Sequence, residues 1–329
     1  MKILITGGAG FIGTNSALFF KEKGYNEIHI FDNLSKKGSE KNLKMLNFVK
    51  FHHGDLSKLE DIDKCLSSYL FDAILHLGGQ TAVTTSTTDP RTDFNSNALG
   101  TFNLLESIRK FCPLAKLIYS STNKVYGSLK NQKIRETDLR YELTDSPDGI
   151  KDTELLEFYS PYGCSKGCAD QYVNDYSRIY NLNTFVLRQS CIYGCHQNGT
   201  EDQGWLSWFI QAYLENHPLT IYGDGKQVRD LLHVQDLANL YVKMFESKTV
   251  ESNIYNVGGG PQNTISLLET VKFLDQAIET KTILFGKERP GDQKVFYSDN
   301  YKIKQDFNWE PKINKEKGIF EIINFYKNV

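Results

Sequence analysis

The chain has 329 residues, 40% of them hydrophobic, and its 38 basic and 40 acidic side chains leave a net charge of −2. This length suits a single two-lobed α/β enzyme. The near balance of charge argues against nucleic-acid and membrane partners. We find no signal peptide and no apolar run of the roughly 18 residues that a membrane helix needs. We therefore expect a cytoplasmic protein whose six cysteines stay reduced and bind no metal.

The first half of the chain alternates short β-branched strands with helical patterns. In chain order we predict strand 2–6, helix 11–23, strands 27–31, 48–52 and 73–77, helix 97–111, strand 116–120, helix 160–180 and strand 184–188. Alternation of this kind is typical of parallel βαβ units. The expected fold class is therefore α/β, with a Rossmann-type doubly wound parallel sheet.

After about residue 190 the pattern becomes irregular, with short strands and helices. We expect residues 1–190 to form the Rossmann domain, to which segments at about 229–257 return. Residues 191–329 are expected to form a smaller α/β C-terminal lobe that binds the substrate. Residues 135–157 are polar and acidic, which predicts an inserted surface loop or flap.

A glycine fingerprint joins the first predicted strand to the first helix. Gly7, Gly10 and Gly13 have GxxGxxG spacing, which allows a tight turn, a close approach of the pyrophosphate, and close packing of helix on strand. The first helical turn, with Phe11 and Ile12, offers free N–H groups and a partial positive charge to the phosphates. The sequence therefore predicts a dinucleotide site here.

Asp32 ends the second predicted strand, where a carboxylate accepts hydrogen bonds from ribose hydroxyls and repels a 2′-phosphate. Lys36 lies nearby and favours a phosphate, but its side chain is expected to be flexible and to face solvent. We therefore predict NAD as the cofactor. Asn33 belongs to the same predicted site. Asp55 and Leu56 follow the third strand and are placed to contact the adenine, although Asp55 also suits a helix cap.

Tyr162 and Lys166 lie four residues apart, on one face of a predicted helix. A tyrosine is a weak base at neutral pH, but a neighbouring ammonium and a positive nicotinamide ring lower its pKa. Thr122 follows the strand at 116–120, at the sheet edge where its hydroxyl can orient a substrate alcohol. The alternatives are a Tyr/Lys pair that only covers a helix and a threonine that only satisfies backbone groups. Together with the fingerprint, the three residues predict redox chemistry at a hydroxyl.

Segments 7–13, 120–127 and 162–166 resemble the extended short-chain dehydrogenase/reductase superfamily of nucleotide-sugar epimerases and dehydratases, and the resemblance covers nearly the whole chain. It implies that Tyr162 is the catalytic base, Thr122 its hydroxyl partner and Lys166 the cofactor-binding lysine. Residues 97–101 match the NxxGT segment, whose asparagine supports the active site.

The residues after Thr122 separate the reactions of this superfamily. Its dehydratases carry an Asp-Glu pair at that point, whereas this chain has Asn123 and Lys124. Neither side chain can replace the missing carboxyl groups. The resemblance therefore argues against a 4,6-dehydratase and favours an epimerase.

Segments 80–86, 121–127, 160–166 and 199–205 more closely resemble the CDP-tyvelose (CDP-paratose) 2-epimerases. That resemblance implies NAD-dependent inversion at C2 of a CDP-linked 3,6-dideoxyhexose through a 2-keto intermediate. It also implies a role in making sugars for lipopolysaccharide O-antigen. In this superfamily the helices corresponding to 97–111 and 161–180 form a dimer bundle, so we expect a homodimer or homotetramer.

The resemblance further implies a nucleotide-sugar site in the second lobe. Arg229 and Arg289 are expected to bind the diphosphate, because a guanidinium makes paired, charge-assisted hydrogen bonds. Asp292 is expected to accept from ribose hydroxyls, the alternative being a surface Arg–Asp ion pair. The expected substrate contacts are Thr122, Asn123, Gln189, Ser190, Gln203, Tyr222, Arg229, Arg289 and Asp292.

Several alternatives stay open at this point. A UDP-sugar 4-epimerase, or a 2-epimerase of another CDP-hexose such as CDP-glucose, would share every catalytic residue named. An ordinary dehydrogenase would release NADH in each cycle, and a non-catalytic NAD sensor would not need all three catalytic side chains. The sequence leaves open the sugar, the base, the reacting carbon and the number of subunits.

Overall fold

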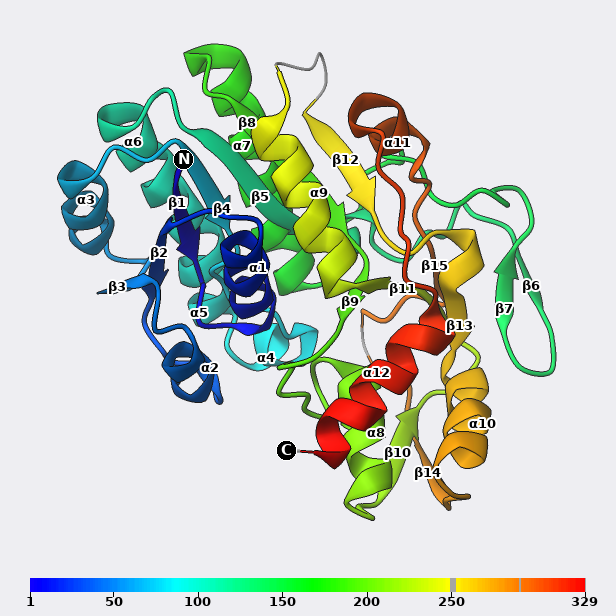
Figure 1. The fold of residues 1–329 in the computed structure, drawn as a ribbon. Coiled ribbons are helices and arrows are strands. Elements are labelled where there is room, and N and C mark those ends of the chain that lie inside the picture. The colour runs from blue at the N-terminus through cyan, green and yellow to red at the C-terminus, as the bar shows by residue number, and fades with distance from the viewer. Residues whose placement is uncertain (249–252, 290, 329) are drawn as a thin grey trace.

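A seven-stranded parallel sheet forms the centre of the fold (Figure 1). The computed structural model describes residues 1–248, 253–289 and 291–328. The sheet order is β12, β8, β5, β4, β1, β2, β3. The strands are β1 (Lys2–Thr6), β2 (Glu27–Asp32), β3 (Lys50–His53), β4 (Ala73–His76), β5 (Lys116–Thr122), β8 (Thr184–Gln189) and β12 (Ile254–Val257). The chain order reverses between β1 and β4, which is where such sheets bind ligands at the carboxyl ends of their strands.

Helices cover both faces of this sheet (Figure 1). Alternate residues of each strand face opposite sides, so Ile3 and Ile5 pack into one core with Phe20 of α1, while Leu4 packs into the other with Leu104 of α6. The first core is covered by α1 (Phe11–Glu22) and α9 (Val234–Glu246), and the second by α3 (Leu59–Ser68), α6 (Gly100–Phe111) and α7 (Pro161–Tyr180). The predicted doubly wound α/β fold is confirmed.

After β8 the chain builds a smaller set of sheets and helices. β11 pairs with β9, β13 and β15, and β10 pairs with β14. These strands are β9 (Cys191–Tyr193), β10 (Leu219–Tyr222), β11 (Val228–His233), β13 (Thr264–Ser266), β14 (Ile283–Gly286) and β15 (Val295–Phe296). The helices α8 (Trp205–Leu214), α10 (Leu267–Ala277) and α12 (Lys315–Lys327) pack around a separate core.

Part of the later chain returns to the central sheet. β12 pairs with β8, and α9 packs beside α1. β11 does not return, because it pairs with strands of the smaller sheet, and residues 249–252 lie outside the described chain. The division into two lobes at residue 190 stays a prediction.

The segment 135–157 is more ordered than the surface loop that its polarity predicts. β6 (Ile134–Glu136) and β7 (Tyr141–Leu143) form an antiparallel hairpin at one side of the molecule (Figure 1). Tyr141, Leu143 and Ile150 are buried in one cluster with Phe296. Three apolar side chains within the acidic run thus anchor it.

The predicted helix 97–111 is interrupted near its start. A π-helical turn, Asn95–Leu99, links α5 to α6. Such turns widen the helix and are frequent at functional sites. The remaining elements are α2 (Ser39–Met45), α4 (Val83–Thr88), α5 (Pro90–Phe94), η2 (Asn123–Tyr126), η3 (Pro261–Asn263) and α11 (Tyr301–Phe307). Among the described residues, no helix is long and apolar enough to span a bilayer.

Candidate active site

The glycine-rich turn between β1 and α1 is built too tightly for side chains. Gly7 has φ +65°, and a Cβ there would lie 2.7 Å from the backbone of Gly78. A Cβ on Gly13 would lie 2.5 Å from the Cα of Gly8. No side chain caps α1 at Gly10, so its first N–H groups are left for an anion such as a phosphate. The turn therefore fits the pyrophosphate of a dinucleotide.

Asp32 ties the end of β2 to this turn. One carboxylate oxygen accepts a hydrogen bond of 3.1 Å from the Ala9 N–H, and the other accepts one of 2.8 Å from the Leu34 N–H. Asn33 donates to Asp55 at 3.2 Å, so the residues that end β2 and follow β3 are linked. Three of the predicted cofactor contacts from these loops are thus linked beside the turn, and the fourth, Leu56, is buried. Their contacts with NAD stay a proposal.

The two glycines after β4 make room for neighbouring side chains. A Cβ on Gly78 would lie 2.4 Å from Leu56, and one on Gly79 would lie 2.3 Å from the amide oxygen of Asn97. The absence of a Cβ at both positions therefore lets this turn approach Leu56 and Asn97 closely. Asn97 also donates to Asp93 at 3.1 Å and to Ser165 at 3.0 Å, which joins the π-turn to α7.

A narrow crevice lies next to the glycine-rich turn. Gly10, Phe11 and Lys36 line it from the Rossmann side, and Gln203 lines it from the later chain. The Lys36 ammonium donates a hydrogen bond of 2.5 Å to the Gln203 side-chain oxygen. The Lys36 side chain is exposed, as expected, although burial lowers the pKa of its ammonium to about 8.

Tyr162 and Thr122 lie together at the carboxyl end of the sheet. Thr122 ends β5, and its hydroxyl accepts from the Lys124 N–H at 3.2 Å. Tyr162 starts α7, whose cap is Ser160. Burial raises the pKa of Tyr162 to about 12, a hydrogen bond with Thr122 opposes this, and the charge of Asp93 adds to it. The positive charge of a bound nicotinamide ring would act against this rise, because an opposite charge favours the ionised form of the phenol.

Lys166 lies one turn after Tyr162 on α7 and is also buried. Its ammonium donates to the Ser120 carbonyl oxygen at 2.5 Å and lies over the Tyr119 ring. Burial lowers the pKa of Lys166 to about 7, against the charges of Asp170 and Asp93. The predicted Tyr/Lys arrangement on one helical face is present.

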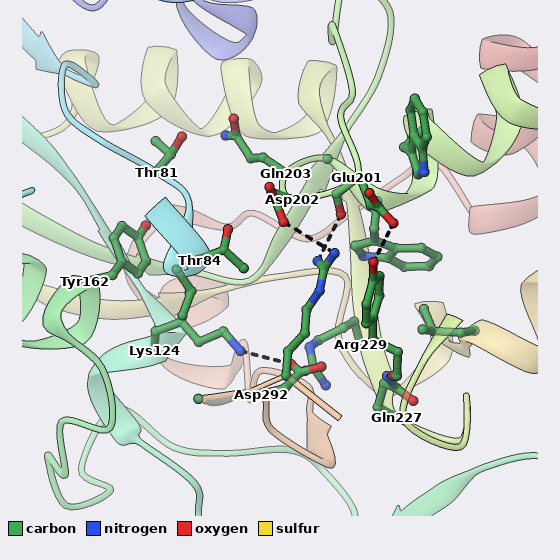
Figure 2. Close-up of a pocket in the computed structure, with 18 of the residues that line it drawn as sticks. Thr81, Thr84, Lys124, Tyr162, Glu201, Asp202, Gln203, Gln227, Arg229 and Asp292 are labelled. Atoms are coloured by element: carbon green, nitrogen blue, oxygen red, sulfur yellow. Dashed lines mark hydrogen bonds and ion pairs between the residues drawn. The ribbon is translucent and has the colours of Figure 1, made fainter. Parts of the chain in front are cut away.

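A pocket of about 290 Å³ opens between this end of the sheet and the later chain. Figure 2 shows Tyr162 and Lys124 on one side of it and Arg229 and Gln227 on the other. Seven of the nine predicted substrate residues line the pocket, namely Thr122, Asn123, Gln203, Tyr222, Arg229, Arg289 and Asp292.

The cations of this pocket are all paired with acidic groups. Asp292 accepts from Arg229 at 2.5 Å and lies 3.4 Å from the Lys124 ammonium. Although burial alone would raise it, the pKa of Asp292 is lowered to about 2, chiefly by Arg229 and then by Lys124. The carboxylate is therefore ionised at every pH at which the protein is expected to work.

Arg289 closes the other side of the pocket. It donates to the Glu201 carbonyl oxygen at 2.9 Å, pairs with Asp202 at 3.3 Å, and lies 3.9 Å from the centre of the Tyr222 ring. Tyr222 donates to the Glu201 side chain at 2.7 Å. These partners hold a guanidinium at the pocket wall, where it can bind a diphosphate. Pro290, which follows Arg289, lies outside the described residues.

Two predicted substrate residues lie outside this pocket. Gln189 is buried between Ser120, from which it accepts, and Tyr241, to which it donates at 2.8 Å. The Ser190 hydroxyl donates to the buried Asp230. Both side chains are engaged in hydrogen bonds within the protein and neither lines the pocket, so we do not propose them as substrate contacts.

Other lining residues were missed by the sequence reasoning. Thr81 and Thr84 belong to a segment used only for a resemblance, Gln227 lies between the predicted residues Tyr222 and Arg229, and Trp208 was not assigned to the site. Lys124 had a signal, because it follows Thr122 by two residues. In the described part of the chain, no three His, Cys, Asp or Glu residues are grouped to hold a metal ion.

Comparison with known proteins settles the family. Residues 3–258 match the NAD dependent epimerase/dehydratase family. The chain belongs to this family. CDP-paratose 2-epimerase of Salmonella typhi is 43% identical over 339 aligned residues, which cover 100% of both chains. This confirms the resemblance to that group of epimerases.

Solved structures of the family have the same architecture. A UDP-glucose 4-epimerase of Thermotoga maritima, determined with UDP-glucose, has a TM-score of 0.87 at 28% identity, covering 100% of this chain and 99% of its own. A UDP-glucose 4-epimerase of Thermus thermophilus, determined with NAD, has a TM-score of 0.85 at 27% identity, covering 100% of both chains. The chain is therefore an NAD-dependent enzyme of the epimerase and dehydratase family, as predicted.

Proposed function

We propose that this enzyme inverts C2 of a CDP-linked 3,6-dideoxyhexose and interconverts CDP-paratose and CDP-tyvelose. The observation that carries the proposal is a pocket with Thr122 and Tyr162 at one end and two arginines at the other. A sugar hydroxyl fits the first end, and a diphosphate fits the second. The choice of sugar and base is supported by the full-length likeness to the Salmonella typhi enzyme.

The proposed reaction uses Tyr162 as the base for the sugar 2-hydroxyl. Thr122 holds the oxygen while Tyr162 takes its proton, and Lys166 contributes positive charge beside them. NAD, when bound, accepts a hydride and returns it. Between these two events the planar 2-keto sugar turns over in the pocket, so that the opposite face is reduced. Tyr162 then gives the proton back, and no net oxidation occurs.

The residues after Thr122 support epimerisation over loss of water. Asn123 is held by Gln293, which accepts from its amide at 3.3 Å and donates to its carbonyl oxygen at 3.3 Å. Lys124 is a cation paired with Asp292. Neither Asn123 nor Lys124 has a carboxylate that could act as a base next to the sugar, so the keto intermediate keeps its hydroxyl groups.

We further propose that two copies associate through α6 and α7. Phe102 and Tyr172 are exposed large side chains on these helices, with ring centres 5.5 Å apart, and Ile179 and Tyr180 extend the same surface. Burying such a patch between subunits would remove it from water.

All six cysteines carry free thiols, which supports a cytoplasmic enzyme. We assign it to supplying sugars for a surface polysaccharide.

A substrate panel tests the proposal. The purified enzyme is given CDP-paratose, CDP-glucose and UDP-glucose in separate reactions, and the products are identified by chromatography and mass spectrometry with authentic standards. We expect conversion of CDP-paratose at a far higher kcat/KM than either hexose. Preferred conversion of UDP-glucose to UDP-galactose would instead establish a 4-epimerase. A steady rise of free NADH would indicate an ordinary dehydrogenase.

A further inference from the structure

Lys124 is a partly buried cation that links the two ends of the pocket. It lies on η2, two residues after Thr122, and its side chain lines the pocket. Its ammonium lies 3.4 Å from Asp292, which accepts from Arg229 at 2.5 Å (Figure 2). A line of contacts therefore runs from the reacting end, at Thr122, through Lys124 and Asp292 to Arg229.

The backbone of Lys124 is fixed at the catalytic end. Its N–H donates to the Thr122 hydroxyl at 3.2 Å. Its carbonyl oxygen packs against Gly163 at the start of α7, where a Cβ would lie 3.0 Å away. Gly163 directly follows Tyr162, so the lysine backbone and the predicted base are held by adjoining segments. Any substrate that reaches from Tyr162 to Arg229 passes this lysine.

Lys124 carries charge that its own partners do not neutralise. It shares the single carboxylate of Asp292 with Arg229, so the cluster has two cations and one anion. Burial lowers the pKa of Lys124 to about 8, with Asp292 and Cys191 opposing this and Arg229 adding to it. The ammonium is therefore the main form at neutral pH. A buried surplus of positive charge is costly unless an anion joins it.

We propose that Lys124 binds the sugar-linked phosphate of the substrate. The inference rests on the proposed function. A sugar whose 2-hydroxyl lies at Thr122 and Tyr162 carries its phosphate on the adjacent carbon, C1, and Lys124 is the cation next to that end. The second phosphate then faces Arg229 and Arg289. Asp292 keeps the lysine protonated and directed into the pocket before the substrate arrives.

Binding of CDP and CMP to the NAD-loaded enzyme, measured by calorimetry at pH 7, tests the assignment. CDP has the phosphate that is linked to the sugar in the substrate, whereas CMP lacks it and keeps only the phosphate on the nucleoside. Lys124→Met keeps the length of the side chain and removes its charge. We expect it to weaken CDP binding about tenfold to a hundredfold, the range for a charged hydrogen bond, and CMP binding less than about threefold. Lys124→Arg should recover most CDP affinity, and Lys130→Met, at an exposed lysine, should change neither.

The pH dependence gives a second readout. In the wild type, CDP binding should weaken as the pH rises through about 8, because the ammonium of Lys124 loses its proton. In Lys124→Met this weakening should disappear between pH 7 and 9.5. A purely structural lysine would give the same pH slope in both proteins, which would overturn the proposal.

The outcomes separate the inference from the proposed function. Equal CDP affinity in wild type and Lys124→Met, or equal weakening of CMP and CDP, overturns the phosphate assignment. Melting temperature and NAD content show whether Lys124→Met folds. If it does not, Lys124→Gln is measured instead, at a concentration of folded protein equal to that of the wild type. The ratio of CDP affinity to CMP affinity then decides in the same way. Failure of the wild type to convert any CDP-sugar, in contrast, contradicts the proposed function itself.

Discussion

Lys166 donates a hydrogen bond of 2.5 Å from its ammonium to the Ser120 carbonyl oxygen, and so joins α7 to the end of β5. The same ammonium lies 4.3 Å from the centre of the Tyr119 ring. Burial has lowered the pKa of Lys166 to about 7. The lysine is therefore held at the strand end by the protein itself, before any cofactor binds.

Replacing Lys166 by methionine should impair both cofactor retention and turnover. The change removes the charge that favours the ionised form of Tyr162 and a donor for the nicotinamide ribose. We expect kcat to fall about 100-fold or more and the NAD content of the purified protein to fall as well. NAD is released by heat and quantified enzymatically. Lys110→Met, at an exposed lysine, serves as the control, and wild-type kcat in Lys166→Met would exclude the assigned role.

Removing the hydroxyl of Tyr162 should separate chemistry from cofactor binding. Tyr162→Phe keeps the ring in its buried site but removes the proton acceptor. We expect kcat to fall about 10²- to 10⁴-fold with NAD content unchanged. Tyr301→Phe alters an exposed tyrosine on α11 and should have no such effect. An undiminished rate in Tyr162→Phe would rule this residue out as the base.

Asp32 should select NAD over NADP. Its carboxylate lies at the end of β2, where its negative charge would repel the 2′-phosphate of NADP. After removal of bound cofactor, Asp32→Ala should lower the preference for NAD over NADP at least about tenfold in reconstitution assays. The exposed Asp138→Ala provides the comparison. An unchanged preference would place the selection elsewhere, with Lys36 the next residue to test.

A pair of stacked histidines should make the fold sensitive to acid. His29 lies 2.9 Å from His52 through their ring nitrogens, and burial lowers the pKa of His29 to about 4. In the unfolded chain His29 is protonated as the pH falls below about 6.5, whereas in the folded protein it is protonated only near pH 4. The contribution of His29 to the free energy of unfolding is therefore fully present above pH 6.5 and is lost as the pH falls from 6.5 toward 4.

We expect this linkage to contribute about 1 kcal/mol, discounted for partial solvation. His29→Phe should reduce the loss of stability between pH 6.5 and 4.5, as measured by urea unfolding at each pH. His217→Gln, at an exposed histidine, should leave the loss as it is in the wild type. An identical pH slope in His29→Phe and wild type would show that other groups cause the acid sensitivity.

The central sheet could be predicted because its signals are local. Parallel strands buried on both faces are continuous apolar runs, and Lys2–Thr6 shows this with Ile3, Leu4 and Ile5. The glycine fingerprint and the Tyr/Lys pair are also short motifs on single elements. The smaller sheets carry weaker signals, because a strand such as Val295–Phe296 is two residues long and pairs with a strand far away in the chain.

The site was less predictable where contacts are distant in sequence or depend on register. Lys124 pairs with Asp292, 168 residues later, and no spacing rule reveals such a pair. Gln189 and Ser190 were placed at the right strand end, but which way each side chain points depends on the pairing of β8 with β5 and β12. The hairpin at β6 and β7 was hidden by the charged residues around its few buried side chains.

The most direct measurement is proton NMR of the purified enzyme with CDP-paratose in D₂O, with no added cofactor. We predict that the H1–H2 coupling of the sugar changes from the gluco to the manno type. We also predict that no deuterium appears at C2, because the hydride is returned from cofactor retained in the enzyme. Conversion with substantial deuterium at C2 would contradict internal hydride return. No conversion of CDP-paratose would contradict the proposed substrate.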